Sequence, residues 1–179
     1  MGRPEPDCTE SVLLALPDRR RADVRRLMHA VTERARRYFR QEFGLEAATV
    51  ETEPGAIQTP ASFLCVKGTL PGTLILQARA SAARALLIHM TGRDCAPEEE
   101  ALLLGETLNE VLNIVAGNIT RDLAEAGLTV LIQPPFAAVW NGRQGTPLAG
   151  ERLCSRCVLR TTVGDFLFAF AVLDQIEDL

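Results

Sequence analysis

A carboxylate and a carboxamide three residues apart, Glu110 and Asn113, are the pair of side chains in this sequence best suited to do chemistry. Residues at i and i+3 of a helix leave the same patch of its surface. The carboxylate can pair with a cation, and the amide can both donate a hydrogen bond to a water molecule and accept one from it. Gly117 follows one helical turn later, and a glycine inside a helix costs roughly 1 kcal/mol relative to alanine. These residues together have the properties of a docking site.

The segment that carries them is predicted to be one long amphipathic helix over residues 97–126. It begins with Pro97 and three glutamates, which are favourable in a first helical turn, and it stops before Gly127, a typical C-terminal cap. Glu106, Glu110, Asn113 and Gly117 fall on its polar side. Polar residues on such a side are often merely solvated, so periodicity alone leaves both interpretations open. The opposite, apolar stripe, which we expect to be buried, consists of Leu104, Leu108, Val111, Leu112, Val115, Ile119 and Leu123.

The nine residues from Glu110 to Asn118, EVLNIVAGN, resemble the signature of the CheC/CheX phosphatases of bacterial chemotaxis, which is E-x-x-N followed by an apolar pair, Ala, Gly and Asn. Residues 68–92 are similar to that family's hairpin with its Gly-rich turn and to the helix that follows. Residues 128–142 resemble the strand, Pro and Gly after the signature helix. The last hairpin fits too, so the resemblance covers about residues 60 to 175, in order and without large gaps.

The resemblance implies an activity. In this family the substrate is the phospho-aspartate of a response-regulator receiver, typically CheY. Carried over to this sequence, Glu110 would pair with the receiver's lysine, and Asn113 would orient the attacking water. The receiver is expected to hold the Mg²⁺, so no metal or cofactor of the chain's own is expected. This division of labour is chemically reasonable, because phosphoryl transfer needs positioning and charge stabilisation more than covalent help.

A second E-x-x-N, formed by Glu106 and Asn109, overlaps the first one turn earlier. The Ala-Gly-Asn that follows sets the register, so Glu110 and Asn113 are taken as the catalytic pair. Glu106, Asn109 and Gly117 are then expected to contact the partner from the same helix. The preceding helix, SAARALLIHMT, carries no such motif, which indicates one site per chain and a protein closest to CheX.

The fold implied by the resemblance is α+β, a mostly antiparallel sheet flanked by long helices, with weak internal pseudo-duplication. The residue patterns agree: residues 166–174 are apolar on both faces, which predicts a central strand. Ser81 is a plausible N-cap for a helix over 82–90. Residues 1–17 are interpreted as a flexible tail, with a short packed helix at SVLLAL as the alternative, and residues 18–179 as a single domain.

Composition excludes several classes of function. Residues 1–50 hold ten arginines and eight acidic residues, whereas residues 51–179 hold nine basic and fifteen acidic residues. Nucleic-acid binding is therefore not expected, because phosphate contacts need clustered Lys and Arg. No apolar run is long enough for a membrane span and the N-terminus lacks a secretory pattern, so a cytoplasmic protein is expected. The first helix, residues 18–42, is predicted to bury an apolar stripe made of Val24, Leu27, Met28, Val31, Ala35 and Tyr38. Its many arginines are interpreted as a solvated face rather than as a surface that binds acidic lipid or nucleic acid.

Five cysteines without framework spacing indicate reduced thiols. Cys154 and Cys157 form a C-x-x-C, but they lie in a predicted strand, where residues three apart are expected on opposite faces. With only two histidines in the chain, a zinc site is not expected.

Three functions remain open from the sequence. The first is a CheX-like phosphatase of a receiver. The second is a catalytically silent CheX-like module that binds a receiver or acts as a dimeric scaffold in two-component signalling. The third is an unrelated domain with an accidental motif, against which the ordered similarity argues. The resemblance also implies a homodimer joined through sheet edges.

Overall fold

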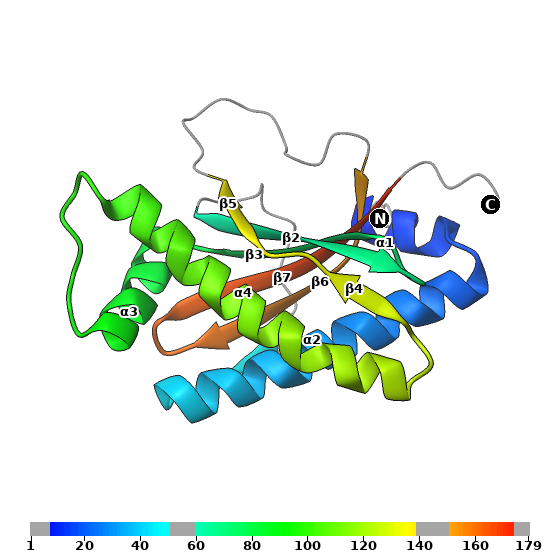
Figure 1. Cartoon of the computed structure of the whole chain (residues 1–179), viewed down its shortest axis with the longest axis horizontal. Coiled ribbons are helices and arrows are strands. Elements are labelled where there is room, and N and C mark those ends of the chain that lie inside the picture. The colour runs from blue at the N-terminus through cyan, green and yellow to red at the C-terminus, as the bar shows by residue number, and fades with distance from the viewer. Residues whose placement is uncertain (1–7, 51–59, 139–150, 174–179) are drawn as a thin grey trace, which may run out of the picture.

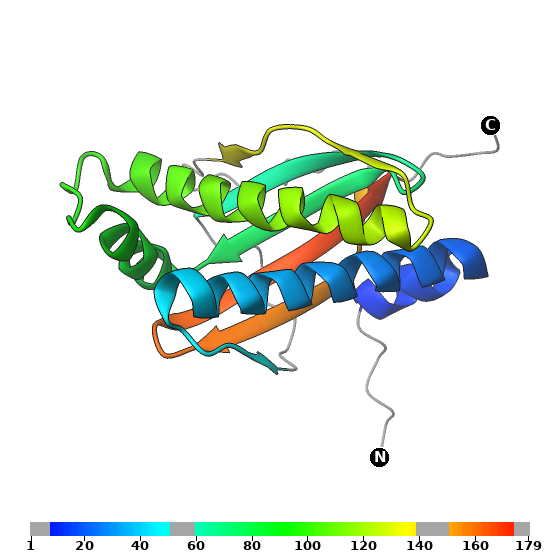
Figure 2. The same cartoon turned by 60° about the horizontal axis from the view of Figure 1, so that its bottom comes forward.

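The computed structural model describes residues 8–50, 60–138 and 151–173, and within these ranges the chain forms a sheet covered on one face by helices (Figures 1 and 2). This is the α+β class predicted from the sequence. The helices are α1 (Cys8–Ala15), α2 (Asp18–Phe43), α3 (Ala80–Thr91) and α4 (Glu100–Glu125). The strands are β1 (Ala48–Val50), β2 (Ala61–Gly68), β3 (Gly72–Ala78), β4 (Val130–Ile132), β5 (Phe136–Ala138), β6 (Glu151–Thr161) and β7 (Gly164–Leu173).

The sheet has the strand order β1-β6-β7-β3-β2-β4, with β5 also paired to β2, and every neighbouring pair is antiparallel. The predicted central position of the last strand is confirmed, because β7 lies between β6 and β3. Its phenylalanines, Phe166, Phe168 and Phe170, belong to the core beneath the helices. Its alanines, Ala169 and Ala171, point to the other face and join Phe63 in a second buried cluster.

The two long helices lie side by side across one face of the sheet (Figure 2). The apolar stripe predicted for α4 is confirmed, since all seven of its residues are at most 1% exposed. In α2, Tyr38 is only half-buried, and Phe39 beside it takes the fully buried place. Phe39 packs against Phe166 of β7 with the ring centroids 4.7 Å apart, so α2 is fixed on the sheet by aromatic contacts.

Helix α1 occupies part of the segment that was interpreted as a flexible tail. Val12 lies in the main core, so residues 8–15 are packed on the body, as in the alternative for SVLLAL. Ser81 does not cap α3: the residue before this helix is Arg79, and no side chain caps it. Helix α4 begins at Glu100, because residues 97–99 form a turn. Residues 139–142, the end of the segment 128–142 that carries part of the resemblance, lie outside the described residues.

The expectation that Cys154 and Cys157 point to opposite faces was wrong. A β-bulge between Leu153 and Ser155 shifts the alternation of β6, so both cysteines contact the core beneath the helices. Burial raises the pKa of the Cys154 thiol to about 12, and its Sγ donates to the carbonyl oxygen of Phe170 at 3.3 Å. This thiol is a packing residue, because the reactive thiolate form is suppressed.

Candidate functional site

The exposed face of α4 carries the residues singled out from the sequence. Glu106, Glu110, Asn113 and Gly117 are all exposed, and their helical spacing places them in one stripe along the helix. The opposite stripe is buried against the sheet, so the orientation of α4 is fixed by its core side chains. The carboxylates and the amide of this face therefore project into solvent from α4, a helix that lies across the sheet (Figure 1).

The two overlapping E-x-x-N motifs differ in their asparagines. Asn113 is exposed, whereas Asn109 is half-buried. The hydroxyl of Ser62, a fully buried residue of β2, donates to Oδ1 of Asn109 at 2.6 Å. One asparagine is thus bonded to the sheet, and the other is available to a partner.

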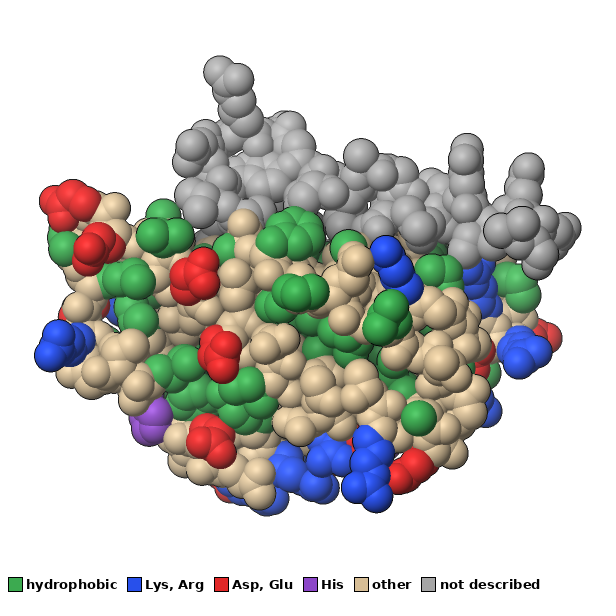
Figure 3. Space-filling model, viewed as in Figure 1, with side chains coloured by type: hydrophobic (Ala, Val, Ile, Leu, Met, Phe, Trp, Pro, Cys, Tyr) green, Lys and Arg blue, Asp and Glu red, His purple; other side chains and the backbone are tan. Residues whose placement is uncertain are grey.

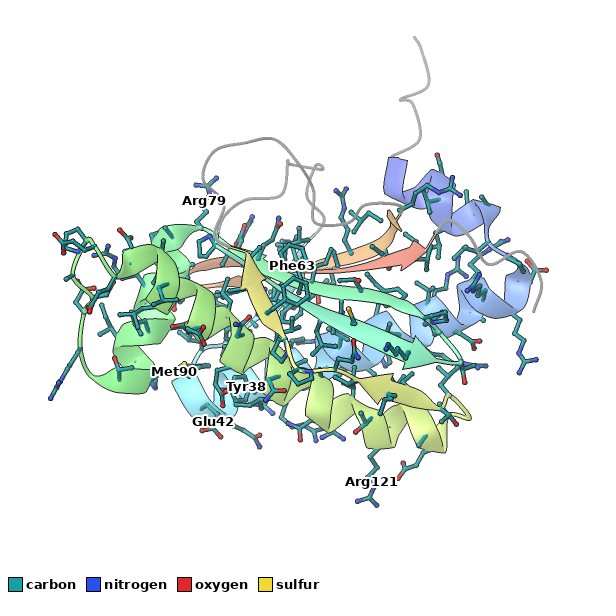
Figure 4. All side chains as sticks on the ribbon, turned by 45° about the horizontal axis from the view of Figure 1, so that its top comes forward. Tyr38, Glu42, Phe63, Arg79, Met90 and Arg121 are labelled. Carbon is teal, nitrogen blue, oxygen red and sulfur yellow. The ribbon has the colours of Figure 1, made fainter. Side chains whose placement is uncertain are left out.

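The ends of α2 and α3 border this face. Burial raises the pKa of Tyr38, and the charges of Glu42 and Glu110 raise it further, so the end of α2 that carries Tyr38 lies within electrostatic range of Glu110. Nε2 of His89 lies 2.9 Å from the backbone oxygen of Glu42 and joins the two helix ends. Met90, 40% exposed, lies in the same region (Figure 4). The surface here is an apolar patch with acidic side chains around it (Figure 3).

An ion pair fixes α2 against α4. Nε and Nη2 of Arg34 each donate to a carboxylate oxygen of Asp122, both at 2.6 Å. The hydrogen bond to Arg34 holds the pKa of Asp122 below its usual value, and Asp122 raises the pKa of Arg34. The pair lies on the flank of α4 away from Asn109, so the helix is tied on both sides of its exposed stripe.

Sequence reasoning missed this pair, because its members are 88 positions apart. Arg34 was grouped with the solvated arginines of the first helix, and several of those also form ion pairs. Arg26 pairs with Asp23 at 3.1 Å and Arg36 with Glu33 at 3.3 Å. An i, i+3 pattern of opposite charges was the available signal for these two, but it carries no information about α4.

No metal centre is built into the part of the chain that the structure describes, since it contains no group of three or more His, Cys, Asp or Glu side chains able to hold an ion. Among the same residues no helix is long and apolar enough to cross a membrane. The exposed face of α4 offers carboxylates and an amide to a partner.

This chain is similar to known proteins in its three-dimensional structure. No model of a known protein family and no curated protein matches the sequence. CheX from Desulfovibrio desulfuricans superposes with a TM-score of 0.65 at 15% identity, over 80% of this chain and 97% of that one. The CheX–CheY–BeF₃–Mg²⁺ complex from Borrelia burgdorferi gives 0.63 at 17% identity, over 83% of this chain and 97% of that one. The chain has the CheX/CheC-like fold.

The CheX/CheC-like fold does not by itself decide the function. The middle domain of FliM from H. pylori also superposes, with a TM-score of 0.52 at 13% identity, over 88% of this chain and 94% of that one. Proteins with different names thus share the architecture, and identities this low establish the fold alone. The function has to be argued from the side chains on α4.

Proposed function

We propose that this protein is a CheX-like phosphatase that hydrolyses the phospho-aspartate of a response-regulator receiver of the CheY type. The observation that carries the proposal is the exposed pair Glu110 and Asn113 on α4, in a chain with the CheX/CheC-like fold. The CheX of Borrelia burgdorferi was crystallised with CheY, BeF₃ and Mg²⁺. A partner of the same kind is proposed for this chain.

In the proposed complex, Glu110 pairs with a lysine of the receiver and sets the position of α4 over the phosphorylated aspartate. Asn113 then binds a water molecule through its amide and holds it in line with the bond to be broken. The water oxygen attacks phosphorus, the bond from phosphorus to the aspartate oxygen breaks, and the carboxylate and inorganic phosphate leave. Mg²⁺ bound by the receiver would neutralise the charge of the phosphoryl oxygens. A neutral amide adds no negative charge beside them, which suits Asn113 to the task.

Gly117 supports a close approach of the partner. A Cβ built at Gly117 meets nothing within 4 Å, whereas one at Gly105 lies 2.8 Å from the Cβ of Ala137 in β5. Packing inside the molecule therefore accounts for Gly105 but not for Gly117. We propose that a glycine stands at position 117 to make room for the receiver, whose surface would lie against the helix backbone there.

The test is the decay of a phosphorylated receiver from the same organism. Wild type should accelerate decay, Asn113→Ala should abolish the acceleration while binding largely survives, and Glu110→Ala should mainly weaken binding. Gln133→Ala, which removes an exposed amide outside α4, is the matched control and should behave as wild type. Binding without acceleration by wild type would indicate the silent module instead. Normal hydrolysis by both site variants would show that the site is wrongly assigned.

We also propose that the protein is a homodimer joined through sheet edges. β4 lies at one edge of the sheet, and β5 pairs with the same strand, β2. Leu131 of β4 is 65% exposed and Phe136 of β5 is 48% exposed. Large apolar side chains on an edge strand favour pairing with a second chain.

A further inference from the structure

The bond between Ser62 and Asn109 fixes which end of the Asn109 amide faces outward. Ser62 is fully buried, and its hydroxyl holds Oδ1 of Asn109 at 2.6 Å. A carboxamide accepts through its oxygen and donates through its nitrogen. Because the oxygen is anchored on the sheet side, the two N–H donors of Nδ2 are left for the outer side. Among the described residues, none accepts a hydrogen bond from this nitrogen.

These donors lie at the border of the proposed site. Asn109 precedes Asn113 by four residues and follows Glu106 by three, so the three side chains share one patch of α4. Asn109 is half-buried, and its anchor, Ser62, belongs to β2, which pairs with β3 on one side and with β4 and β5 on the other. A donor held by such a support loses little freedom when it binds, and this increases its contribution to recognition.

We infer that Asn109 is a positioning residue, whose anchored amide donates to an oxygen of the receiver beside the phosphorylated aspartate and so aligns Asn113 with the phosphoryl group. The inference rests on the proposed function and assigns a separate role to the first of the two overlapping motifs. The acceptor is either a phosphoryl oxygen or an oxygen of the receiver chain. A phosphoryl acceptor exists only in the phosphorylated receiver, so comparing the two forms of the receiver distinguishes these sources.

Asn109→Asp is the informative substitution. It keeps an oxygen that can accept from Ser62 but replaces the outward donors by a second carboxylate oxygen. We expect a KM for the phosphorylated receiver at least about tenfold higher, because a hydrogen bond to a charged or partly charged acceptor is lost and repulsion is added. The melting temperature should change little. Wild-type KM and kcat for Asn109→Asp would overturn the inference and leave Asn109 a structural residue.

A double variant, Ser62→Ala with Asn109→Ala, covers the case in which Asn109→Asp does not fold. Removing both partners leaves no orphaned buried hydroxyl and is close to neutral for stability, yet it removes the donors. It should raise KM as Asn109→Asp does. A well-folded double variant with wild-type KM would also overturn the inference. Ser62→Ala alone keeps the amide but frees it, and should raise KM only a few-fold.

The source of the acceptor follows from the dissociation constants of wild type and of Asn109→Asp. Each is measured with the receiver carrying BeF₃ and Mg²⁺ and with the unmodified receiver. A loss of affinity in Asn109→Asp that is confined to the BeF₃ form would identify a phosphoryl oxygen as the acceptor. An equal loss of affinity for both forms would identify an oxygen of the receiver chain. Wild type is the reference in every series. If wild type neither binds nor accelerates decay, the proposed function fails and the inference with it; if wild type is active and all Asn109 variants match it, only the inference fails.

Discussion

Replacing Gly117 with alanine should make the protein more stable and a poorer phosphatase. The backbone of Gly117 is helical, with no positive φ, and a Cβ there meets nothing within 4 Å. Alanine is favoured over glycine in a helix interior by about 0.5–1 kcal/mol. For a chain of 179 residues, such a gain raises the melting temperature by about 1–4 °C.

The same methyl group should obstruct the receiver. Extra volume forced into a closely packed contact costs about 1–3 kcal/mol, which corresponds to about a 5- to 150-fold weaker affinity. The assay is a dissociation constant for the receiver with BeF₃ and Mg²⁺, measured beside a thermal melt of the same preparation. A loss of affinity in a stabilised protein cannot be ascribed to damage of the fold.

Two outcomes would refute the reasoning at different steps. A lower melting temperature for Gly117→Ala would contradict the open space around the Cβ position. A higher melting temperature with unchanged affinity would mean that the receiver does not approach the helix at Gly117, and the docking surface would have to be moved towards Glu106.

Three further predictions concern packing, charge and assembly. Gly105→Ala should lower stability by about 1–3 kcal/mol in a chemical unfolding experiment, because its methyl would meet the Cβ of Ala137 at 2.8 Å. Asp122→Asn should lower stability at neutral pH by about 0.5–1 kcal/mol, since the pair with Arg34 is about one-third exposed. Because the folded-state pKa of Asp122 is lowered, this difference in stability should vanish as the pH falls below about 4, through that pKa. A difference that stays constant with pH would contradict the role of the ion pair. Leu131→Glu should convert the proposed dimer to a monomer in light scattering with helical content unchanged, and an unaltered mass would exclude this edge as the interface.

Local periodicity was sufficient to predict the main elements and the exposed face of α4. The buried stripe of this helix and the central position of β7 both follow from patterns within one segment. The same reasoning placed Tyr38 in the core stripe of α2 and overlooked Phe39, because two aromatic residues at adjacent positions differ by only 100° around a helix. It also misjudged the faces of Cys154 and Cys157, because a β-bulge breaks the alternation of a strand without a sequence signal strong enough to locate it.

The contacts that position the site could not be read from the sequence. Ser62 and Asn109 are 47 positions apart, and Arg34 and Asp122 are 88 apart. Each bond depends on where the sheet and α2 place a side chain relative to α4, which is a property of the tertiary structure. The overlapping motifs were therefore assigned from the resemblance, and only the structure reveals that their asparagines have different surroundings.

Under the proposed function, α4 is the helper in a reaction whose nucleophile is water and whose Mg²⁺ is held by the phosphorylated partner. Such a helper contributes only positions, and positions are useful when they are rigid to a fraction of an ångström. Helix α4 is packed on the sheet along its whole buried stripe and is bonded on one flank to Ser62 and on the other to Arg34. The exposed stripe between these two anchors carries Glu110 and Asn113. Under the proposed function, a few side chains on this fixed helix would make the fold a phosphatase, and the same fold without them would remain a binding module.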